Sequence, residues 1–318
     1  MQAVNWNHPE DAYTKTFWDQ NVRQFWVDEE IPLADDKPIW MGLSPDERGV
    51  YQKVLAGLTL LDTLQGGVGM PALALREEGL QRKAVLSFMG AMEQMHAKSY
   101  SSIFSTLATL PQIEALFNWV QQDPLLQGKR ALIEARYRQT QEARDWYLAL
   151  SASVLLESYL FYSGFFYPLY LAGAGKMVNA GEIINLILRD ESVHGAYVGM
   201  MAQEVYQGLS ADERRWADGE LLRTLEELEA LEARYTRTLY YPIGLEEEVL
   251  VFSRYNADKA LMNLGQEPHF GVGEGRVNPV VIAGMSTQTK NHDFFSTKGN
   301  GYVKALRVEP LRDEDFYF

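Results

Sequence analysis

The chain has 318 residues, enough for one large domain or two ordinary ones, and its formal net charge of −14 makes nucleic acid an unsuitable partner. Hydrophobic residues make up 47% of the chain and cysteine is absent, so a sizeable core is expected, whereas disulfides, thiolate metal ligands and cysteine nucleophiles are excluded. The chain does not begin with a basic stretch followed by an apolar run, so no signal peptide is expected and the protein is predicted to be cytoplasmic.

The N-terminal half is predicted to be mostly helical. Three helices are expected there, with a proline-containing connector between the first two: residues 9–26, 44–67 and 77–110, and the connector 33–40. Ser44 precedes Pro45 and two acidic residues, which is the pattern of a helix start, because serine caps free N–H groups and proline suits the first turn. Pro111 is expected to end the third helix.

The C-terminal half continues the helical pattern. Helices are expected over residues 124–173, 179–208, 210–240 and 245–264. No convincing run of alternating apolar and polar residues indicates a strand, so the fold class is predicted to be an all-α bundle. Gly, Asn, Ser and Thr dominate from residue 265, so the chain is expected to divide into a helical domain, 1–264, and a flexible tail, 265–318.

One apolar stretch, residues 146–175, is long enough to be mistaken for a membrane span. Its only formal charge is Glu157, in the middle of the stretch. A carboxylate at the centre of a bilayer costs about 3 kcal/mol, so a buried core helix with an inward carboxylate is the preferred interpretation. No membrane association is predicted.

Two Glu-x-x-His motifs, Glu93–His96 and Glu191–His194, each place a carboxylate and an imidazole on one face of a helix. Two further carboxylates, Asp62 and Glu157, lie in other apolar helical segments. One such motif alone is usually a surface pair, but both of these lie in apolar stretches, where unpaired charges are costly. Helical bundles build dinuclear sites from this inventory, so these six residues are the predicted metal ligands.

The ligand types indicate which metals the site would take. Carboxylates are hard ligands that can bridge two cations, and one imidazole for each metal suits iron or manganese. Four carboxylates balance the charge of two divalent ions, which allows the site to be buried. Zinc is a weaker match, because structural zinc prefers thiolate and imidazole. A dinuclear manganese or iron centre, with two ions per chain, is therefore expected.

A tyrosine breaks the symmetry between the two motifs. Tyr100 follows His96 by four residues and so lies on the ligand face of its helix, whereas Val198 occupies the equivalent position after His194. Tyr100 can be interpreted as a core tyrosine hydrogen-bonded to Asp62 or as a redox-active phenol. The spacing leaves both interpretations open.

The residues around these positions resemble a known family over nearly the whole chain. The matching stretches are LTLLDTL at 58–64, MEQMHAKSYSSIF at 92–104, LESYLFYSG at 156–164, RDESVHG at 189–195 and RYNADKALMNLG at 254–265. They resemble the radical-generating small (beta) subunit of class I ribonucleotide reductase, most closely the class Ib type. The resemblance implies a ferritin-like helical bundle with a dinuclear site in its core, and the activity of a ribonucleoside-diphosphate reductase.

The same resemblance implies a role for each matched position. The metal nearer the tyrosine would be held by Asp62, Glu93 and His96. The other metal would be held by Glu157, Glu191 and His194. Tyr100 matches the stored tyrosyl radical, and the route that carries the radical outward matches Trp26, Asp190 and Tyr302. The apolar pocket around the radical matches Phe161, Phe165 and Ile187.

The resemblance also implies partners. The C-terminal tail would dock on the large (alpha) subunit, the beta subunit would form a homodimer, and a flavodoxin-like protein would activate a manganese centre. The chain ends in Phe316-Tyr317-Phe318, which departs from the Trp-Asn-Phe ending of many class Ib members and affects the expected docking detail.

Two alternatives belong to other functional classes. A ferritin-like iron-oxidising or storage protein would keep the ligands but needs neither Tyr100 nor a docking tail. A dimetal oxidase or oxygenase acting on a small organic substrate would be expected to lose Tyr100 and Tyr302. Both tyrosines are present, which favours the reductase subunit.

Overall fold

The structure is a computed structural model, and it describes residues 2–285. Within that range every regular element is a helix and no strand occurs, as the sequence predicts. The long helices are α3 (Pro45–Leu64), α5 (Leu80–Leu107), α8 (Ala143–Leu155), α9 (Tyr162–Gly173), α10 (Val178–Gly208), α11 (Ala211–Tyr240) and α12 (Glu246–Asn263). The shorter ones are α1 (Thr14–Arg23), α2 (Lys37–Gly42), α4 (Met70–Arg76), α6 (Leu110–Gln122), α7 (Pro124–Tyr137) and α13 (Pro279–Met285).

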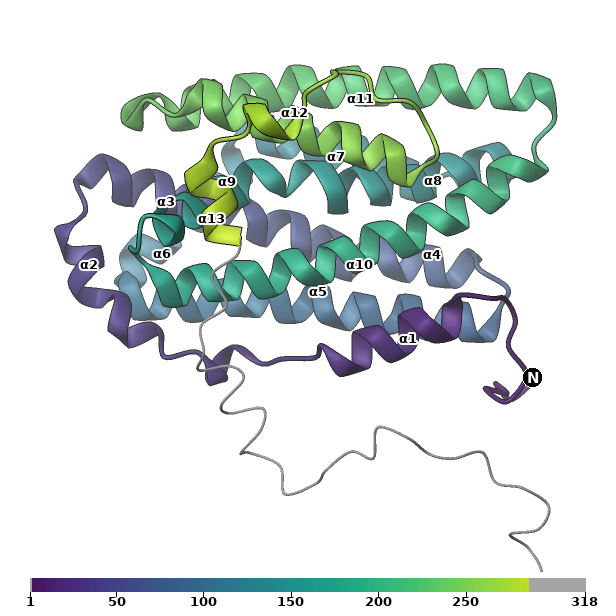
Figure 1. The fold of residues 1–318 in the computed structure, drawn as a ribbon, viewed down its shortest axis with the longest axis horizontal. Coiled ribbons are helices and arrows are strands. Elements are labelled where there is room, and N and C mark those ends of the chain that lie inside the picture. The colour runs from purple at the N-terminus through teal and green to yellow at the C-terminus, as the bar shows by residue number, and fades with distance from the viewer. Residues whose placement is uncertain (1, 286–318) are drawn as a thin grey trace, which may run out of the picture. The chain divides into compact units, whose positions relative to one another are not determined.

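Four helical rods form the centre of the bundle. α3 packs on α5, α10 packs on α8 and α9, and the two pairs are joined by contacts of α3 with α9 and of α10 with α5 (Figure 1). The side chains between these rods are almost entirely buried and apolar, including Leu55, Leu86, Val154 and Ile184. Each rod therefore presents one face to a common core, which is where helical bundles place metal sites.

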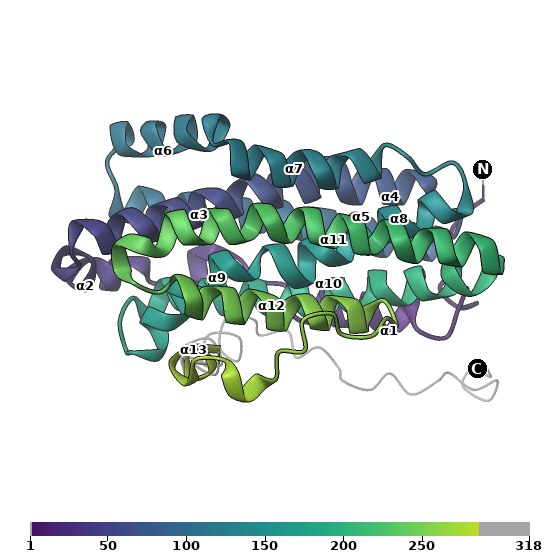
Figure 2. The same cartoon turned by 90° about the horizontal axis from the view of Figure 1, so that it is seen from above.

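Other helices cover this centre. α11 lies along α7, α8 and α12 on one side, and α1 lies against α5 and α10 on another (Figures 1 and 2). α11 is the charged, amphipathic helix that the sequence predicts over residues 210–240, and its buried residues include Leu221, Leu225 and Leu228. Burial of that stripe contributes roughly 1.5–3 kcal/mol for each large apolar side chain.

Local capping explains why several helices begin where the sequence predicts. Ser44 accepts a hydrogen bond from the backbone N–H of Glu47, whose carboxylate accepts one from the N–H of Ser44, and Pro45 follows at the first helical position. Ser210 and Glu213 form the same reciprocal box at the start of α11. Such caps satisfy N–H groups that would otherwise have no partner.

Several predicted boundaries were wrong. Pro111 does not stop a helix but lies in the first turn of α6, where its missing N–H has no consequence. The segment expected as one helix over 124–173 is broken at residues 138–142, between α7 and α8. The connector over 33–40 contains a 3-10 turn (Leu33–Asp36) and the start of α2.

The helical body also continues past residue 264, where the sequence predicts a tail. Asp258 accepts hydrogen bonds from the backbone of His269 and Phe270, which ties the segment after α12 to that helix. α13 then packs closely on α9: a Cβ at Gly173 would lie 1.9 Å from the carbonyl oxygen of Val280. The helical part therefore reaches Met285, and the predicted tail beyond it lies outside the described residues.

The apolar stretch from Ala143 to Gly173 is the one described helical segment that is long and apolar enough to cross a membrane. In the fold it comprises α8 and α9, and the whole of its most apolar window is buried against other helices. It is therefore a buried core segment, as the sequence predicts.

Candidate metal centre

The six predicted ligands come from the four central rods and meet in the core. The structure brings them into two groups, Asp62, Glu93, His96 and Glu191 in the first and Glu93, Glu157, Glu191 and His194 in the second. Within each group one ligand atom from every residue lies within 4.8 Å of the others. All six side chains have no exposed surface.

In the structure, the glutamate of each motif lies beside the histidine of the other motif. The spacing of these residues in the sequence does not predict this pairing. The Nδ1 atom of His96 lies 2.9 Å from Glu191 Oε1, and that of His194 lies 2.7 Å from Glu93 Oε1. Each glutamate therefore faces the histidine of the other motif. Because Glu93 and Glu191 belong to both groups, two cations bound there would share them.

The donor set fits two divalent cations. Both carboxylate oxygens of Asp62, Glu93 and Glu191 are buried without a hydrogen-bond partner, as is Nδ1 of each motif histidine. Buried polar atoms normally have partners, and several unpartnered ones converging on one place indicate a bound ion. Four carboxylates supply four negative charges, which two divalent ions neutralise.

Burial and mutual repulsion shape the protonation of the cluster. Desolvation raises the pKa of Asp62 and of Glu157 well above the usual range, and neighbouring carboxylates add to the rise. For His96, burial lowers the pKa, but its bond to Asp190 and the close approach of the negatively charged carboxylates raise the pKa well above the ordinary value. Protons therefore compete with cations for these atoms, so metal binding releases protons.

Two π-helical segments aim side chains at the cluster. Leu156–Leu160 joins α8 to α9 and contains Glu157, and Gln65–Gly69 follows α3 directly. A π-turn inserts an extra residue into a helix and rotates the residues after it, and such turns are frequent at functional sites. No pattern in the sequence predicts either segment.

Tyr100 lies on α5 one turn beyond His96 and is fully buried. Its hydroxyl has no hydrogen-bond partner, so the bond to Asp62 considered in the sequence analysis is not formed. Burial, followed by the negative charges of Asp62 and Glu191, raises the pKa of the phenol well above 10. Phe161, Phe165, Ile187 and Val198 are likewise fully buried.

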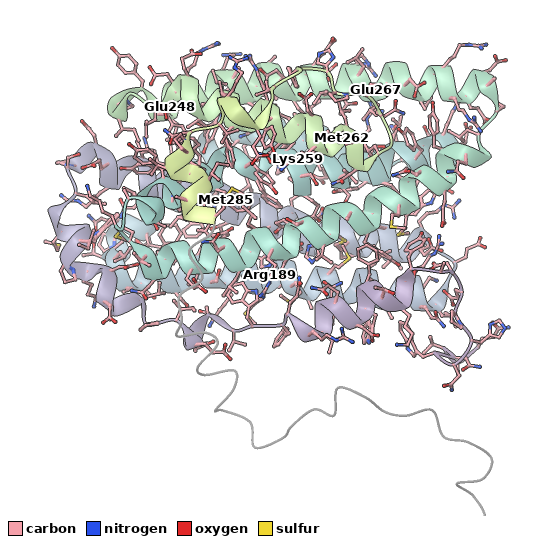
Figure 3. All side chains as sticks on the ribbon, viewed as in Figure 1. Arg189, Glu248, Lys259, Met262, Glu267 and Met285 are labelled. Atoms are coloured by element: carbon pink, nitrogen blue, oxygen red, sulfur yellow. The ribbon has the colours of Figure 1, made fainter. Side chains whose placement is uncertain are left out.

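Asp190 connects the first histidine to the predicted tryptophan. One of its oxygens accepts a hydrogen bond from Trp26 Nε1 at 2.7 Å and lies 3.1 Å from His96 Nε2. The other oxygen accepts from Gln24 Nε2 at 2.6 Å. Arg189 on α10, labelled in Figure 3, donates to the carbonyl of Gln24 and holds this segment against the bundle. The Trp26 ring stacks on the His96 ring, with centroids 6.0 Å apart.

Sequence reasoning missed several buried polar neighbours of the cluster. Gln65 donates a hydrogen bond to Glu157, and Gln24 donates to Asp190. Gln65 follows Asp62 by three residues, so its helical spacing could have identified it. Tyr137, which bonds to Gln65, had no signal in the sequence, because it comes from a different helix. Tyr302 lies outside the described residues.

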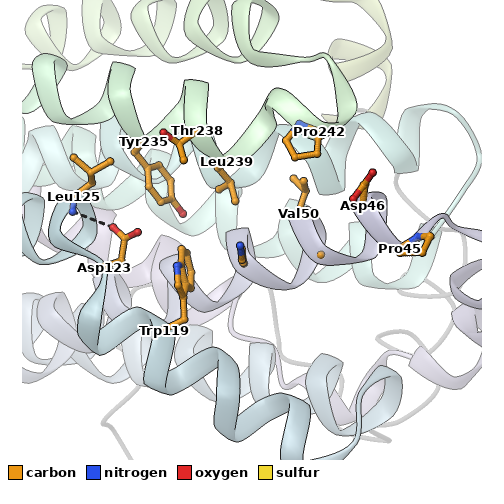
Figure 4. Close-up of a pocket in the computed structure, with 12 residues that line it drawn as sticks. Pro45, Asp46, Val50, Trp119, Asp123, Leu125, Tyr235, Thr238, Leu239 and Pro242 are labelled. Carbon is orange, nitrogen blue, oxygen red and sulfur yellow. Dashed lines mark hydrogen bonds between the residues drawn. The ribbon is translucent and has the colours of Figure 1, made fainter.

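A surface pocket lies elsewhere in the fold. It is lined by residues of α3, α6 and α11, among them Lys53, Trp119 and Tyr235, and by Asp123, which caps α7 (Figure 4). None of the six clustered residues lines it. The pocket and the cluster are therefore separate features.

Known proteins match this chain over nearly all of the part that the structure describes. The model of the family described as ribonucleotide reductase, small chain, matches residues 3–279. Subunit beta of ribonucleoside-diphosphate reductase from Bacillus subtilis is 52% identical and the match covers 99% of this chain and 96% of that protein. Subunit beta of ribonucleoside-diphosphate reductase 2 from Escherichia coli is 40% identical, with 100% and 98% covered.

Among solved structures, the dimanganese(II)-NrdF of Streptococcus sanguinis is 45% identical to this chain and has a TM-score of 0.87. The match covers 90% of this chain and 100% of that one. The range matched by the family includes all six clustered residues and Tyr100.

Proposed function

The chain belongs to the ribonucleotide reductase small-chain family, as a class I beta subunit similar to class Ib members, and from this membership we propose what its buried cluster does. It is the beta subunit of a ribonucleoside-diphosphate reductase, an oxidoreductase. We propose that Tyr100 stores a radical that this subunit passes to the large subunit, where ribonucleotides are reduced to deoxyribonucleotides. The observation that carries the proposal is a buried phenol with no partner beside four buried carboxylates and two imidazoles.

The cluster would hold two metal ions. Asp62, Glu93 and His96 would bind one, Glu157, Glu191 and His194 would bind the other, and the two glutamates of the motifs would be shared. When bound and oxidised by an oxygen-derived oxidant from outside the protein, the two ions would supply the oxidising power that removes one electron from a phenol. The Streptococcus sanguinis relative is a dimanganese protein, so we propose manganese, with iron as the alternative that these ligands also accept.

Tyr100 is suited to store the radical. A buried phenol with a raised pKa keeps its proton, so it loses its electron and its hydroxyl proton together and leaves a neutral radical rather than a buried charge. Phe161, Phe165 and Ile187, which the family resemblance assigns to the pocket around the radical, expose no surface, so water and reductants would be kept away.

The hydrogen-bonded series His96, Asp190 and Trp26 would carry the radical away from the core. Asp190 contacts both rings through the same oxygen, so a proton can shift along the series as an electron moves. The route would continue to Tyr302, which the family resemblance places in the tail.

The partners follow from the same membership. We propose that the part of the tail beyond Met285 docks on the large subunit, that two copies of this chain form a homodimer, and that a flavodoxin-like protein activates the manganese form. We also propose a cytoplasmic location.

Electron paramagnetic resonance of the metal-loaded, activated protein tests the proposal. A tyrosyl signal is expected, and it should disappear in Tyr100→Phe. Tyr51→Phe is a matched control, because Tyr51 is also fully buried with an unpartnered hydroxyl but lies among other neighbours. A loaded and activated protein without a radical, or a signal that persists in Tyr100→Phe, would contradict the proposal.

A further inference from the structure

A series of buried polar side chains leads from α7 to the second ligand group. Tyr137 Oη donates a hydrogen bond to Gln65 Oε1 at 2.6 Å, and Gln65 Nε2 donates one to Glu157 Oε1 at 2.5 Å. Gln65 Nε2 also donates to Ser153 Oγ at 2.8 Å. Tyr137 is 3% exposed and the other three have no exposed surface, so these bonds form without competition from water.

The tyrosine determines which way the amide of Gln65 points. A phenol is protonated at neutral pH and donates its hydrogen to the amide oxygen. With that oxygen engaged, the two N–H donors of Gln65 face Glu157 and Ser153. The reversed amide would place its oxygen against the Glu157 carboxylate, where two acceptors repel each other, so the network fixes the orientation.

This series makes Glu157 different from the other three ligand carboxylates. Both oxygens of Asp62, Glu93 and Glu191 lack a hydrogen-bond partner, but in Glu157 only Oε2 does. Oε2 is also the oxygen that faces His194, at 3.5 Å from Nδ1. Glu157 therefore offers one free oxygen to the second group, and the other is already bound.

The π-helical segment after α3 makes room for this arrangement. A Cβ at Gly69 would lie 2.2 Å from Gln65 Oε1 and 2.8 Å from Tyr137 Cε2. Only glycine at this position allows the phenol to reach the amide. The segment thus serves the hydrogen bond as well as the path of the chain.

We propose that Gln65 and Tyr137 are positioning residues that hold Glu157 by one oxygen, so that Glu157 binds the second metal ion through Oε2 alone. This inference rests on the proposed function, because it requires the cluster to bind two ions. Outer partners of this kind orient a ligand and change metal affinity by about 10- to 100-fold. The first group, which has no such partner on its carboxylates, is not affected.

Titration of the metal-free protein with Mn(II), followed by electron paramagnetic resonance and calorimetry, tests the inference without measuring activity. We expect Gln65→Met to lower the affinity for the second ion about 10- to 100-fold and Tyr137→Phe to lower it about tenfold, with the first ion unchanged. Difference infrared spectra should show Glu157 changing from single-oxygen to two-oxygen binding in both variants.

A double-mutant cycle separates positioning from a general structural effect. If Tyr137 acts only through Gln65, the double variant binds the second ion as Gln65→Met does, and the effects are not additive. Tyr147→Phe is the matched control, because Tyr147 is fully buried and bonds to Gln266 instead. Its Mn(II) binding should equal that of the unaltered protein.

The outcomes that overturn the inference differ from those that overturn the proposed function. Additive effects, equal losses at both ions, or unchanged binding in Tyr137→Phe would contradict the positioning role. Failure of the unaltered protein to bind two ions would instead contradict the proposed function. Thermal unfolding of each variant, followed by circular dichroism, identifies any variant that has lost its fold, and Tyr137→Phe, which removes only one hydroxyl group, then carries the test alone.

Discussion

The two halves of the metal centre have the same ligand types but different neighbours. In the first half, His96 Nε2 lies against Asp190 and the phenol of Tyr100 stands one turn away. In the second half, His194 Nε2 has no hydrogen-bond partner and Val198 occupies the place of the phenol. The repeated motif supplies the same kinds of ligand to both halves. Residues outside the motif give the two halves different neighbours, and we expect the halves to differ in function for that reason.

The largest expected effect comes from a change that disables both halves of the metal centre together. Glu191 contributes to both groups, so Glu191→Ala should abolish binding of both ions, because each group loses one of its carboxylates. Glu157 contributes only to the second group, and Glu157→Ala should leave the first ion in place. Metal content by mass spectrometry after gel filtration measures both. Two ions retained in Glu191→Ala would show that the halves do not share this ligand.

A second change affects the first half alone. Asp190→Asn keeps the size of the side chain but replaces one acceptor oxygen by a donor, so it cannot accept from Trp26 and Gln24 and also meet His96. We expect about 10- to 100-fold lower reductase activity with the large subunit. Binding of the second ion, measured by Mn(II) titration, should not change. A matching loss at the second ion would mean that the halves are coupled.

A third change affects the second half through packing. Gly69→Ala places a methyl group 2.2 Å from Gln65 Oε1, and such crowding destabilises a protein by about 1–3 kcal/mol. Gly67→Ala is the control, because its nearest neighbour is 3.9 Å away and alanine favours helix. Urea unfolding of the two variants gives the difference. If the two variants had the same free energy of unfolding, the result would contradict the close packing of Tyr137 and Gln65 around Gly69.

The smallest expected effect comes from removing the hydrogen bond between Gln65 and Ser153. Ser153→Ala removes one of the two acceptors of Gln65 Nε2 but leaves its bond to Glu157. The expected loss is about 1 kcal/mol of stability, the usual net contribution of one hydrogen bond. Second-ion affinity should stay close to that of the unaltered protein in the same Mn(II) titration. A loss as large as that of Gln65→Met would assign the positioning role to Ser153.

Periodicity and capping predicted much of this fold. The helices expected over 179–208, 210–240 and 245–264 appear as α10, α11 and α12 within two residues at either end. Their signals are local: an apolar stripe, a serine cap, a glycine near the end. The break at residues 138–142 was missed because neither glycine nor proline marks it, and Arg76 secures it from another helix by bonding to Thr140.

The sequence predicts those parts of the site that depend on the spacing of residues within one helix. The six clustered residues could be predicted because carboxylates and imidazoles are conspicuous in apolar helices. The crossing of Glu93 to His194 depends on how two distant helices face each other, which no local pattern encodes. The same is true of Tyr137, whose function comes from a contact with α3 rather than from its own helix.

The close packing of α13 on α9 sets a limit on distance. Because Gly173 and Gly284 allow the two backbones to touch, Met285 is anchored to the bundle. From there, Tyr302 is 17 residues along the chain (302 − 285), which at about 3.4 Å per residue is a tether of at most roughly 58 Å. Any surface that Tyr302 meets must lie within that radius of α13. If the tail docks on the large subunit as proposed, this anchor would set the local concentration of Tyr302 at the docking surface, and loosening the anchor would lower that concentration without altering a docking contact.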